Sequence, residues 1–371
     1  MRVVAAALGI LVIVVIMWDV FEALVLPRRV TRRLRPTRFF YRTTWRLWLL
    51  VGRRLTGDSR RETYLSFYGP LSLLLLLDAW AAILIAGFAS VYWAVTSDLA
   101  FSTALYFSGT TFFTLGLGDI APKGSLPRAL AVVEAGTGFA FLAIVIGYLP
   151  VVYQAFSRRE VNVSLLDARA GSPPSAAELL RRHAGNMDAL ERLLRDWERW
   201  SAELLESHLS YPVLSYYRSQ HDNQSWLGAL TTILDASALV MVGGEGSTAR
   251  QAQLTFAMAR HAVADLAQVL HTPPRRVDPD RLAPETLTQL RTQLAPTRIV
   301  LDGSDMTVRR LTELRAMYEP YVNALGERLL MRLPAWTLRS SGADNWRRTA
   351  WEPAGGRGGV ASSESDGHDH F

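Results

Sequence analysis

Three long apolar runs divide the first 155 residues of this chain. They are Val3–Leu26, Leu71–Val95 and Leu126–Tyr153. Each run exceeds the roughly 20 residues that an α-helix needs to cross the hydrocarbon core of a bilayer. Inside hydrocarbon every backbone polar group must find its partner within the protein, and a helix provides this within a single segment. The sequence therefore predicts an all-α membrane protein with three transmembrane helices.

The orientation of these helices is predicted by the arginines between the first two runs. Residues 28–61 contain twelve arginines and one acidic residue, Asp58, and so have a formal charge of +11, against +6 for the whole chain. Basic residues collect in cytoplasmic loops. We therefore expect a multi-pass protein of the cell inner membrane, with the N-terminus outside and everything after residue 155 in the cytoplasm. Basicity confined to one loop argues against a nucleic-acid partner.

A cleaved signal peptide is the alternative interpretation of the first run. Its charged start consists of Arg2 alone, and no clear cleavage site of small residues follows the apolar core. The chain has no cysteine, which excludes disulfides, thiol catalysis and cysteine zinc sites. Metalloprotease, nucleophile-elbow and phosphate-loop motifs are absent from the sequence as well. Neither an enzyme nor a cofactor is therefore predicted.

A segment too short to cross the bilayer lies between the second and third runs. Residues 99–113 would give a helix of about 12 residues, which rises roughly 18 Å, or half the membrane. The six residues that follow are Thr114, Leu115, Gly116, Leu117, Gly118 and Asp119. Glycine adopts positive φ without steric cost, so glycines at alternate positions let successive carbonyl groups point the same way. Rings of such carbonyls can replace the hydration shell of an ion.

This hexapeptide resembles the potassium-channel signature Thr-Val-Gly-Tyr-Gly-Asp, with Leu115 in place of Val and Leu117 in place of Tyr. The preceding Tyr106–Phe113 resembles the pore helix of two-span bacterial channels and of tandem-pore channels. The resemblance covers about residues 68–155. It implies a re-entrant pore helix and an ion-selectivity filter, with Asp119 at the outer mouth and permeant K+ as the only metal.

The same residues match a rival motif. Gly116–Ala121 fits the dinucleotide-binding pattern G-x-G-x-x-A, which must follow a strand and open a helix within a βαβ unit. Here Pro122 follows directly, and an apolar run of membrane length lies on each side. The filter interpretation is therefore favoured.

A single filter segment per chain cannot close a ring of carbonyls, so a homotetramer is expected. The predicted function is a potassium-selective channel. Leucine at position 117 cannot make the hydrogen bond through which the usual tyrosine braces the filter. A weakly selective cation channel therefore remains an alternative, and a membrane sensor that does not conduct is another.

Residues expected to support the filter are Tyr106, Phe107, Thr110, Thr111 and Glu134. Of these, Glu134 lies about eight residues into the third run, behind the filter. We expect it to hydrogen-bond the hydroxyl of Ser108, Thr110 or Thr111.

Hinge candidates in the third run are Gly136, Gly138, Gly147 and Pro150. The alternative for the glycines is close helix packing through small residues. Proline removes a backbone hydrogen bond and clashes with the preceding turn, so Pro150 is expected to kink the helix.

Acidic residues in the apolar runs need partners, because ionised groups are expensive in hydrocarbon. Asp19 and Glu22 lie within about two turns of Arg28 and Arg29, so ion pairs at the inner interface are expected. Asp78 lies about seven residues inside the second run and must be paired or protonated. Its two interpretations are a structural partner on the first run or the loop, and a role in pH- or voltage-sensitive gating.

The segment Pro36–Arg54 mixes aromatic residues and leucines with arginines. That composition predicts a helix in the membrane interface, with aromatic rings toward lipid and guanidinium groups toward anionic headgroups. Anionic lipids are thus the partner expected for Arg28–Arg61. Residues 1–67 would form an N-terminal unit and residues 68–157 the pore domain.

Residues 158–338 are predicted to form a cytoplasmic α-helical bundle, and residues 339–371 a disordered tail. Ser175 is an expected N-cap, with Glu178 three residues on. From Leu180 to Leu204 apolar residues recur at spacings of three and four, which predicts a helix. Its apolar face would lie in its own bundle core or in an intersubunit coiled coil.

The bundle lacks the alternating β and α pattern of the nucleotide-sensing domains that many bacterial channels carry, so the cytoplasmic ligand expected as a further partner is unknown. Its best candidate site is the polar run Tyr216–Trp226, for which a capped helix junction is the alternative. His208 and His221 could join acids around a metal, although their spacing matches no ligand pattern.

Overall fold

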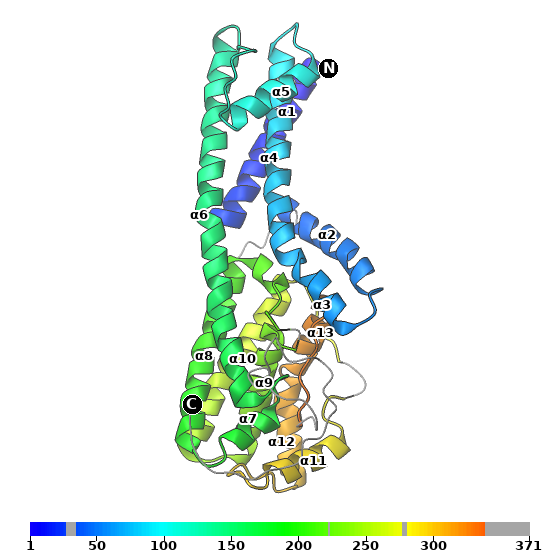
Figure 1. Cartoon of the computed structure of the whole chain (residues 1–371), viewed down its shortest axis with the longest axis vertical. Coiled ribbons are helices and arrows are strands. Elements are labelled where there is room, and N and C mark those ends of the chain that lie inside the picture. The colour runs from blue at the N-terminus through cyan, green and yellow to red at the C-terminus, as the bar shows by residue number, and fades with distance from the viewer. Residues whose placement is uncertain (27–34, 222, 277–279, 338–371) are drawn as a thin grey trace, which may run out of the picture.

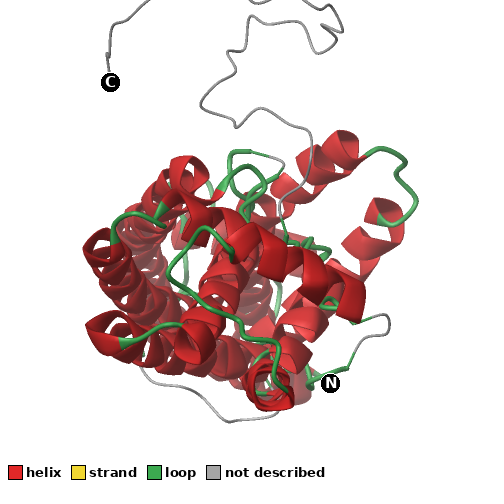
Figure 2. Cartoon of the chain, turned by 90° about the horizontal axis from the view of Figure 1, so that it is seen from below, coloured by secondary structure: helices red, strands yellow, loops and turns green. Residues whose placement is uncertain are grey.

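The computed structural model describes residues 1–26, 35–221, 223–276 and 280–337. These residues are helical wherever they are regular, and no strand occurs among them (Figure 2). The helices of the first half are α1 (Arg2–Val20), α2 (Pro36–Gly52), α3 (Asp58–Ser66), α4 (Tyr68–Val95), α5 (Phe101–Phe112) and α6 (Ser125–Ala170). A π-helical turn, η1 (Phe21–Val25), extends α1.

The second half contains the shorter helices of a bundle. They are α7 (Ala176–Arg182), α8 (Met187–Ser210), α9 (Trp226–Gly243), α10 (Gly246–Val269), α11 (Pro284–Leu294), α12 (Asp305–Ala316) and α13 (Glu319–Leu329). A 3-10 turn, η2 (Pro212–Tyr216), follows α8. The molecule is elongated, with α1, α4, α5 and α6 at one end and the bundle at the other (Figure 1).

Helices α1 and α4 pack side by side because glycines let their backbones approach. A Cβ atom on Gly9 would lie 2.7 Å from the carbonyl oxygen of Gly87, and a Cβ on Gly87 would lie 2.9 Å from Ile13. Small residues at such crossings are typical of helix pairs in membranes, where van der Waals contact replaces the hydrophobic effect.

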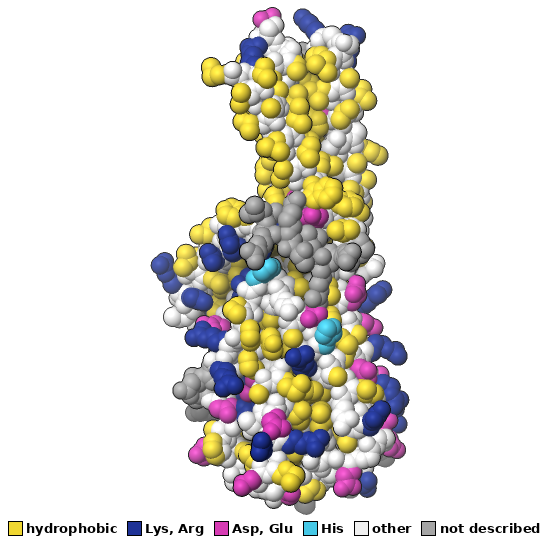
Figure 3. Space-filling view, turned by 180° about the vertical axis from the view of Figure 1, so that it is seen from behind, with side chains coloured by type: hydrophobic (Ala, Val, Ile, Leu, Met, Phe, Trp, Pro, Cys, Tyr) yellow, Lys and Arg dark blue, Asp and Glu magenta, His cyan; other side chains and the backbone are white. Residues whose placement is uncertain are grey.

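Apolar side chains dominate the surface of the upper half, whereas charged side chains lie at its far end and over the bundle (Figure 3). In the described part of the chain, four helical segments are long and apolar enough to cross a membrane: Arg2–Val25, Asp58–Val95, Ser125–Ala170 and Trp226–Gly243. In the last, 83% of the apolar window is buried. Helix α9 is therefore the centre of the bundle, and the other three carry the surface that supports a membrane location.

Helix α6 is continuous across the boundary that the sequence suggested at residue 157. It runs for 46 residues and ends only at Gly171, whose φ of 86° is left-handed. Pro150 lies inside the helix without ending it. The apolar half and the bundle thus share one helix instead of meeting at a linker.

The helix predicted from Ser175 onward is in fact two helices. Ser175 caps α7 as expected, since its hydroxyl accepts from the Glu178 amide at 3.3 Å. The chain then turns at residues 183–186, and Asn186 caps α8 by accepting from the Ala189 amide at 2.9 Å. The apolar seam of α8, including Leu194, is buried within its own bundle. The interpretation as a bundle core is therefore correct, and the coiled coil is not needed.

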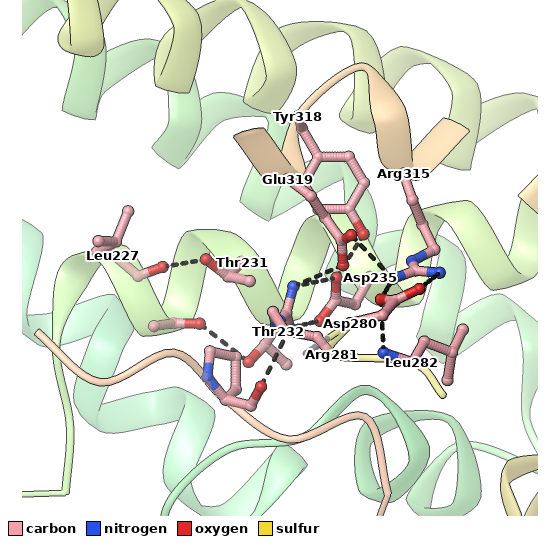
Figure 4. Close-up of polar contacts among 12 residues, drawn as sticks. Leu227, Thr231, Thr232, Asp235, Asp280, Arg281, Leu282, Arg315, Tyr318 and Glu319 are labelled. Carbon is pink, nitrogen blue, oxygen red and sulfur yellow. Dashed lines mark hydrogen bonds and ion pairs between the residues drawn. The ribbon is translucent and has the colours of Figure 1, made fainter. Parts of the chain in front are cut away.

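A buried polar network holds α9, α13 and the segment before α11 together (Figure 4). Asp235 of α9 is fully buried and accepts from Arg281 at 2.6 Å and from the Tyr318 hydroxyl. Arg281 also pairs with Glu319 at 3.1 Å, and Arg315 reaches the same carboxylate at 2.9 Å. Burial raises the pKa of Asp235, while the Arg281 guanidinium opposes that rise. Removing one partner would leave a buried charge without compensation.

Asp235→Asn should lower the free energy of unfolding by about 3–5 kcal/mol, the usual cost of breaking one side of a buried ion pair. Unfolding of the full-length protein in detergent, followed by tryptophan fluorescence, measures this. The control is Glu313→Gln, which removes an exposed pair with Arg309 and should change stability by about 0.5 kcal/mol or less. Equal losses in both variants would show that the network does not stabilise the bundle.

Candidate functional site

The short helix α5 is 12 residues long and enters the space between α4 and α6. Its rise of roughly 18 Å is too small to cross a bilayer. Phe107 packs edge-on against Tyr92 of α4, with ring centroids 4.9 Å apart. The chain then leaves α5 at Phe112 and returns without helical structure to the start of α6.

The returning segment has left-handed residues at alternate positions. Thr114, Gly116 and Gly118 have φ values of 55°, 53° and 78°. The positive φ expected at the two glycines is therefore present, and Thr114 extends the alternation although a β-branched residue is strained there. Three hydrogen bonds anchor the segment to the end of α5: Leu115 N to Thr110 O at 2.8 Å, Gly116 N to the same oxygen at 3.4 Å, and Thr114 N to Thr111 O at 3.0 Å.

The remainder of this segment has little contact with its own chain. Leu115 and Leu117 are 62% and 64% exposed. A Cβ atom placed on Gly116 or Gly118 would meet no atom within 4 Å. The Asp119 carboxylate is within hydrogen-bonding reach of the Tyr106 hydroxyl on α5. The chain itself therefore leaves most of this segment uncovered.

A buried carboxyl group ties α5 to its neighbours. Glu134 of α6 is fully buried, and the Ser108 hydroxyl lies between the Glu134 carboxyl group and the carbonyl oxygen of Ile85, 2.9 Å away. Of the three hydroxyls expected near Glu134, the structure places Ser108 there, whereas Thr110 donates to the Phe107 carbonyl. Helices α4, α5 and α6 therefore meet at one polar point.

Gly138 is a packing residue. A Cβ atom there would lie 1.8 Å from the carbonyl oxygen of Phe112, so α6 touches the end of α5 at this position. At Gly136 and Gly147 a Cβ would meet no atom within 4 Å. Of the hinge candidates, Gly136 and Gly147 retain that interpretation, and the small-residue alternative fits Gly138.

Among the described residues, the acids at the inner end of α1 pair with Arg35. Arg35 lies 3.3 Å from Glu22 and 3.8 Å from Asp19. Asp19 also accepts from the Thr37 amide at 3.0 Å and from the Trp80 indole at 3.1 Å. These contacts join α1, α2 and α4. Arg28 and Arg29, the partners named from the sequence, lie outside the described residues.

Asp78 has no hydrogen bond or ion pair with any residue that the structure describes. Its side chain is exposed on α4. The partner expected on the first apolar run or the loop is therefore not found among the described residues. The part of the loop between residues 27 and 34 lies outside the described residues.

Helix α2 turns its larger aromatic rings away from the predicted lipid side. Tyr41 stacks on Tyr216 at 5.8 Å, and Trp45 is buried with its indole donating to the Arg328 carbonyl at 3.0 Å. The expectation that these rings face lipid is wrong, because the bundle offers them partners. The exposed apolar side chains of α2 are instead Phe39, Leu47, Leu50 and Val51.

The run Tyr216–Trp226 forms the junction between η2 and α9. Tyr216 is buried, and Ser225 caps α9 by accepting from the Gly228 amide at 2.9 Å. The capped-junction interpretation fits this geometry better than a ligand site. Among the described residues no cluster could hold a metal, and His221 is exposed.

Arg159 attaches the inner end of α6 to the bundle. It is buried and donates to the carbonyl oxygens of Leu214 at 2.8 Å and Tyr217 at 3.0 Å. Its guanidinium also lies 3.3 Å from Nε2 of His208, whose Nδ1 donates to the Leu204 carbonyl at 2.8 Å. His208 is thus a neutral acceptor beside a cation, not a metal ligand. The sequence offered no signal for this contact.

Gly138→Ala should destabilise the protein by about 1–3 kcal/mol, since the added methyl group overpacks the contact with Phe112. Gly136→Ala is the matched control, because its Cβ meets open space and alanine favours the helix by up to about 1 kcal/mol. Thermal midpoints of the solubilised proteins compare the two. A loss of similar size in the control would contradict the packing role.

Acid should weaken the contact between α6 and the bundle. Burial, together with the Arg159 guanidinium, lowers the pKa of His208 well below its usual value. The unfolded chain therefore binds this proton below about pH 6.5 while the folded chain resists it, so this stability is present above pH 6.5 and is lost as the pH falls.

His208→Asn, which keeps a donor near Nδ1, should flatten the decline in unfolding free energy between pH 7 and pH 5 by up to about 1.4 kcal/mol per unit. The exposed His221→Asn is the control. Identical pH profiles for wild type and His208→Asn would rule out this contribution.

Comparisons with known proteins agree with this geometry. Over 237 residues, covering 61% of this chain and 68% of the relative, the sequence is 26% identical to the uncharacterized membrane protein YdjJ of Bacillus subtilis strain 168. No solved structure matches the chain. The family model described as ion channel matches residues 79–155, from the middle of α4 to the inner part of α6. That partial segment of the chain, with α5 and the returning segment of alternating φ at its centre, is similar to an ion channel domain of the two-span potassium-channel pore type.

Proposed function

We propose that the protein is a homotetrameric channel that conducts K+ passively across the bacterial inner membrane. The observation that carries this proposal is the alternation of left-handed φ at Thr114, Gly116 and Gly118. It lies between two apolar helices, within the segment that matches an ion channel family. Alternation of this kind turns successive carbonyl groups toward one side, where they can take the place of water around an ion.

The exposed surface of α6 supports assembly into a tetramer. Its largest exposed apolar residues include Val132, Phe139, Ile146 and Tyr153, each at least 69% exposed. They recur every seven residues and so form one stripe along the helix. A stripe of this size needs cover by other copies or by lipid. Four copies would cover it and would also close the ring around Gly116 and Gly118.

The direction of α5 suits a cation. Its C-terminal end, at Phe112, lies against α6 at Gly138, deep in the apolar half. The C-terminus of a helix carries partial negative charge, equivalent to about half an elementary charge. Four such ends would favour a cation below the filter, and Asp119 would add negative charge at the opposite mouth.

The proposed topology places the bundle in the cytoplasm. Helix α2, which carries part of the arginine-rich segment, packs on the bundle through Trp45 and Tyr41. The two therefore lie on the same side of the membrane, and arginine-rich loops are typically cytoplasmic. The N-terminus, at the far end of α1, would then be outside.

Weak selectivity is a second candidate, supported by Leu117. Its side chain is 64% exposed and offers no polar group to a neighbouring pore helix.

Gating would act through α6, because Arg159 joins that helix to the bundle while Gly136 and Gly147 leave it free to bend. The opening stimulus is a ligand or condition sensed by the bundle.

Purified protein in liposomes should take up rubidium, and potassium should carry more current than sodium under equal gradients. Gly116→Ala should abolish uptake without unfolding the protein, because alanine strains a left-handed residue in the filter. Gly185→Ala, in an open turn of the bundle, is the control and should conduct as wild type.

Equal sodium and potassium permeability would support the weakly selective channel instead. An absence of uptake under every condition would leave the non-conducting sensor. Selective current through Gly116→Ala would refute the assignment of the filter.

A further inference from the structure

A large cavity lies at the waist of the molecule, between the apolar helices and the bundle. Its volume of about 960 Å³ is within the range of small-molecule sites. Its walls come from η1, α2, the first turns of α4, η2, the segment after α10, and α13. No residue of the proposed filter lines it. The cavity is therefore a separate site.

The lining of the cavity combines an apolar end with strong positive charge. Leu24, Leu73 and Leu76 line it where the spanning helices end. The lining also contains seven arginines and two glutamates. Such a combination is unfavourable for an empty site, since like charges repel. It suits a ligand that has an apolar part and a negatively charged group.

Much of this charge is not neutralised by the protein. Arg35 pairs with Glu22, and Arg275 pairs with Glu327 at 2.6 Å, which accounts for both glutamates. Across the described part of the chain no ion pair involves Arg42, Arg46 or Arg53. Positions four and seven residues apart share a helix face, so Arg42, Arg46 and the C-cap residue Arg53, whose backbone is still helical, form one row along α2.

The bundle also contributes arginines to the lining of this cavity. Arg328 of α13 lines the same cavity, and its backbone carbonyl is bonded to Trp45 of α2. The pKa of His271, also in the lining, is lowered by burial and further by the guanidinium groups of Arg38 and Arg328. The guanidinium groups of Arg38 on α2 and Arg328 on α13 therefore both act on His271 within the cavity.

We propose that this cavity binds a phosphate group between Arg42 and Arg46 of α2 and Arg328 of α13. Guanidinium groups bind phosphate through pairs of parallel hydrogen bonds. The leucine-lined end takes an apolar chain attached to that phosphate, so an anionic phospholipid fills the whole site. A soluble phosphate compound would fill the charged end alone.

Occupancy of the site would clamp α2 to the bundle. At its N-terminal end, α2 is bonded through Thr37 to Asp19 of α1, which also accepts from Trp80 of α4. A phosphate held in the cavity would thus strengthen the connection between the membrane half and the bundle that Trp45 and Tyr41 of α2 already make. Binding is measured without ion flux, so this proposal can fail or succeed independently of the channel function.

Full-length protein in neutral detergent is titrated with dioctanoyl phosphatidylglycerol, with dioctanoyl phosphatidylcholine and with sodium phosphate. Calorimetry gives the affinity, and the thermal midpoint reports stabilisation by any ligand that binds the folded state. Phosphatidylglycerol should bind and raise the midpoint, and phosphatidylcholine should do so much less. Binding of sodium phosphate with equal strength would support the site and assign it to a soluble phosphate.

The double variant R42Q/R46Q should weaken phosphatidylglycerol binding roughly tenfold or more, the effect expected when charge-assisted contacts are lost. Both side chains are exposed, so the fold should persist. R328Q tests the opposite wall, and its midpoint without ligand reports whether it folds. The matched control is R54Q, an exposed arginine of the same segment outside the cavity, which should bind as wild type.

Three results would overturn the proposal. They are the absence of binding by both phosphatidylglycerol and phosphate, equal binding of the neutral lipid, and a loss in R54Q as large as that in R42Q/R46Q. The last result would mean that general positive charge, not this cavity, attracts the lipid.

Discussion

A peptide group left without a hydrogen bond in hydrocarbon costs several kcal/mol, and this cost governs the upper half of the molecule. Helices α1, α4 and α6 avoid this cost because their peptide groups bond within the same helix. The segment from residue 113 to 124 is irregular between two spanning helices, so its backbone can lie at membrane depth only where it faces water or ions. Helix α5 fixes where this segment begins, because Gly138 admits the end of α5 and Glu134 holds Ser108 behind it.

The apolar helices, the half-length α5 and the glycine conformations could be predicted from the sequence because each depends on local features. Run length decides whether a helix spans, and glycine decides where φ is positive. The left-handed Thr114 could not be predicted in this way, because its strain is offset by bonds to the end of α5. The choice of Arg35 as the partner of Asp19 and Glu22 also depends on tertiary packing, as does the break before Asn186.

Helix α2 shows how far composition can predict orientation. The sequence indicated that α2 is amphipathic, and its arginines do form one face. The sequence did not indicate which way its aromatic rings point. Trp45 and Tyr41 pack on Tyr216 and the bundle, since an aromatic ring gains more from a close partner than from lipid chains. Helix α2 therefore links the apolar half to the bundle.

The unbroken α6 has a mechanical consequence. At about 1.5 Å per residue its 46 residues measure roughly 70 Å, longer than the bilayer is thick. A flexible linker would let the bundle move without moving the apolar half, whereas a continuous helix transmits the displacement. Arg159 and Gly138 lie 21 positions apart on this helix, one gripped by the bundle and the other pressed against the end of α5. A displacement at the first is therefore passed along one continuous helix toward the second, and a bend at Gly147 or Pro150, which lie between them, would change how much of it arrives.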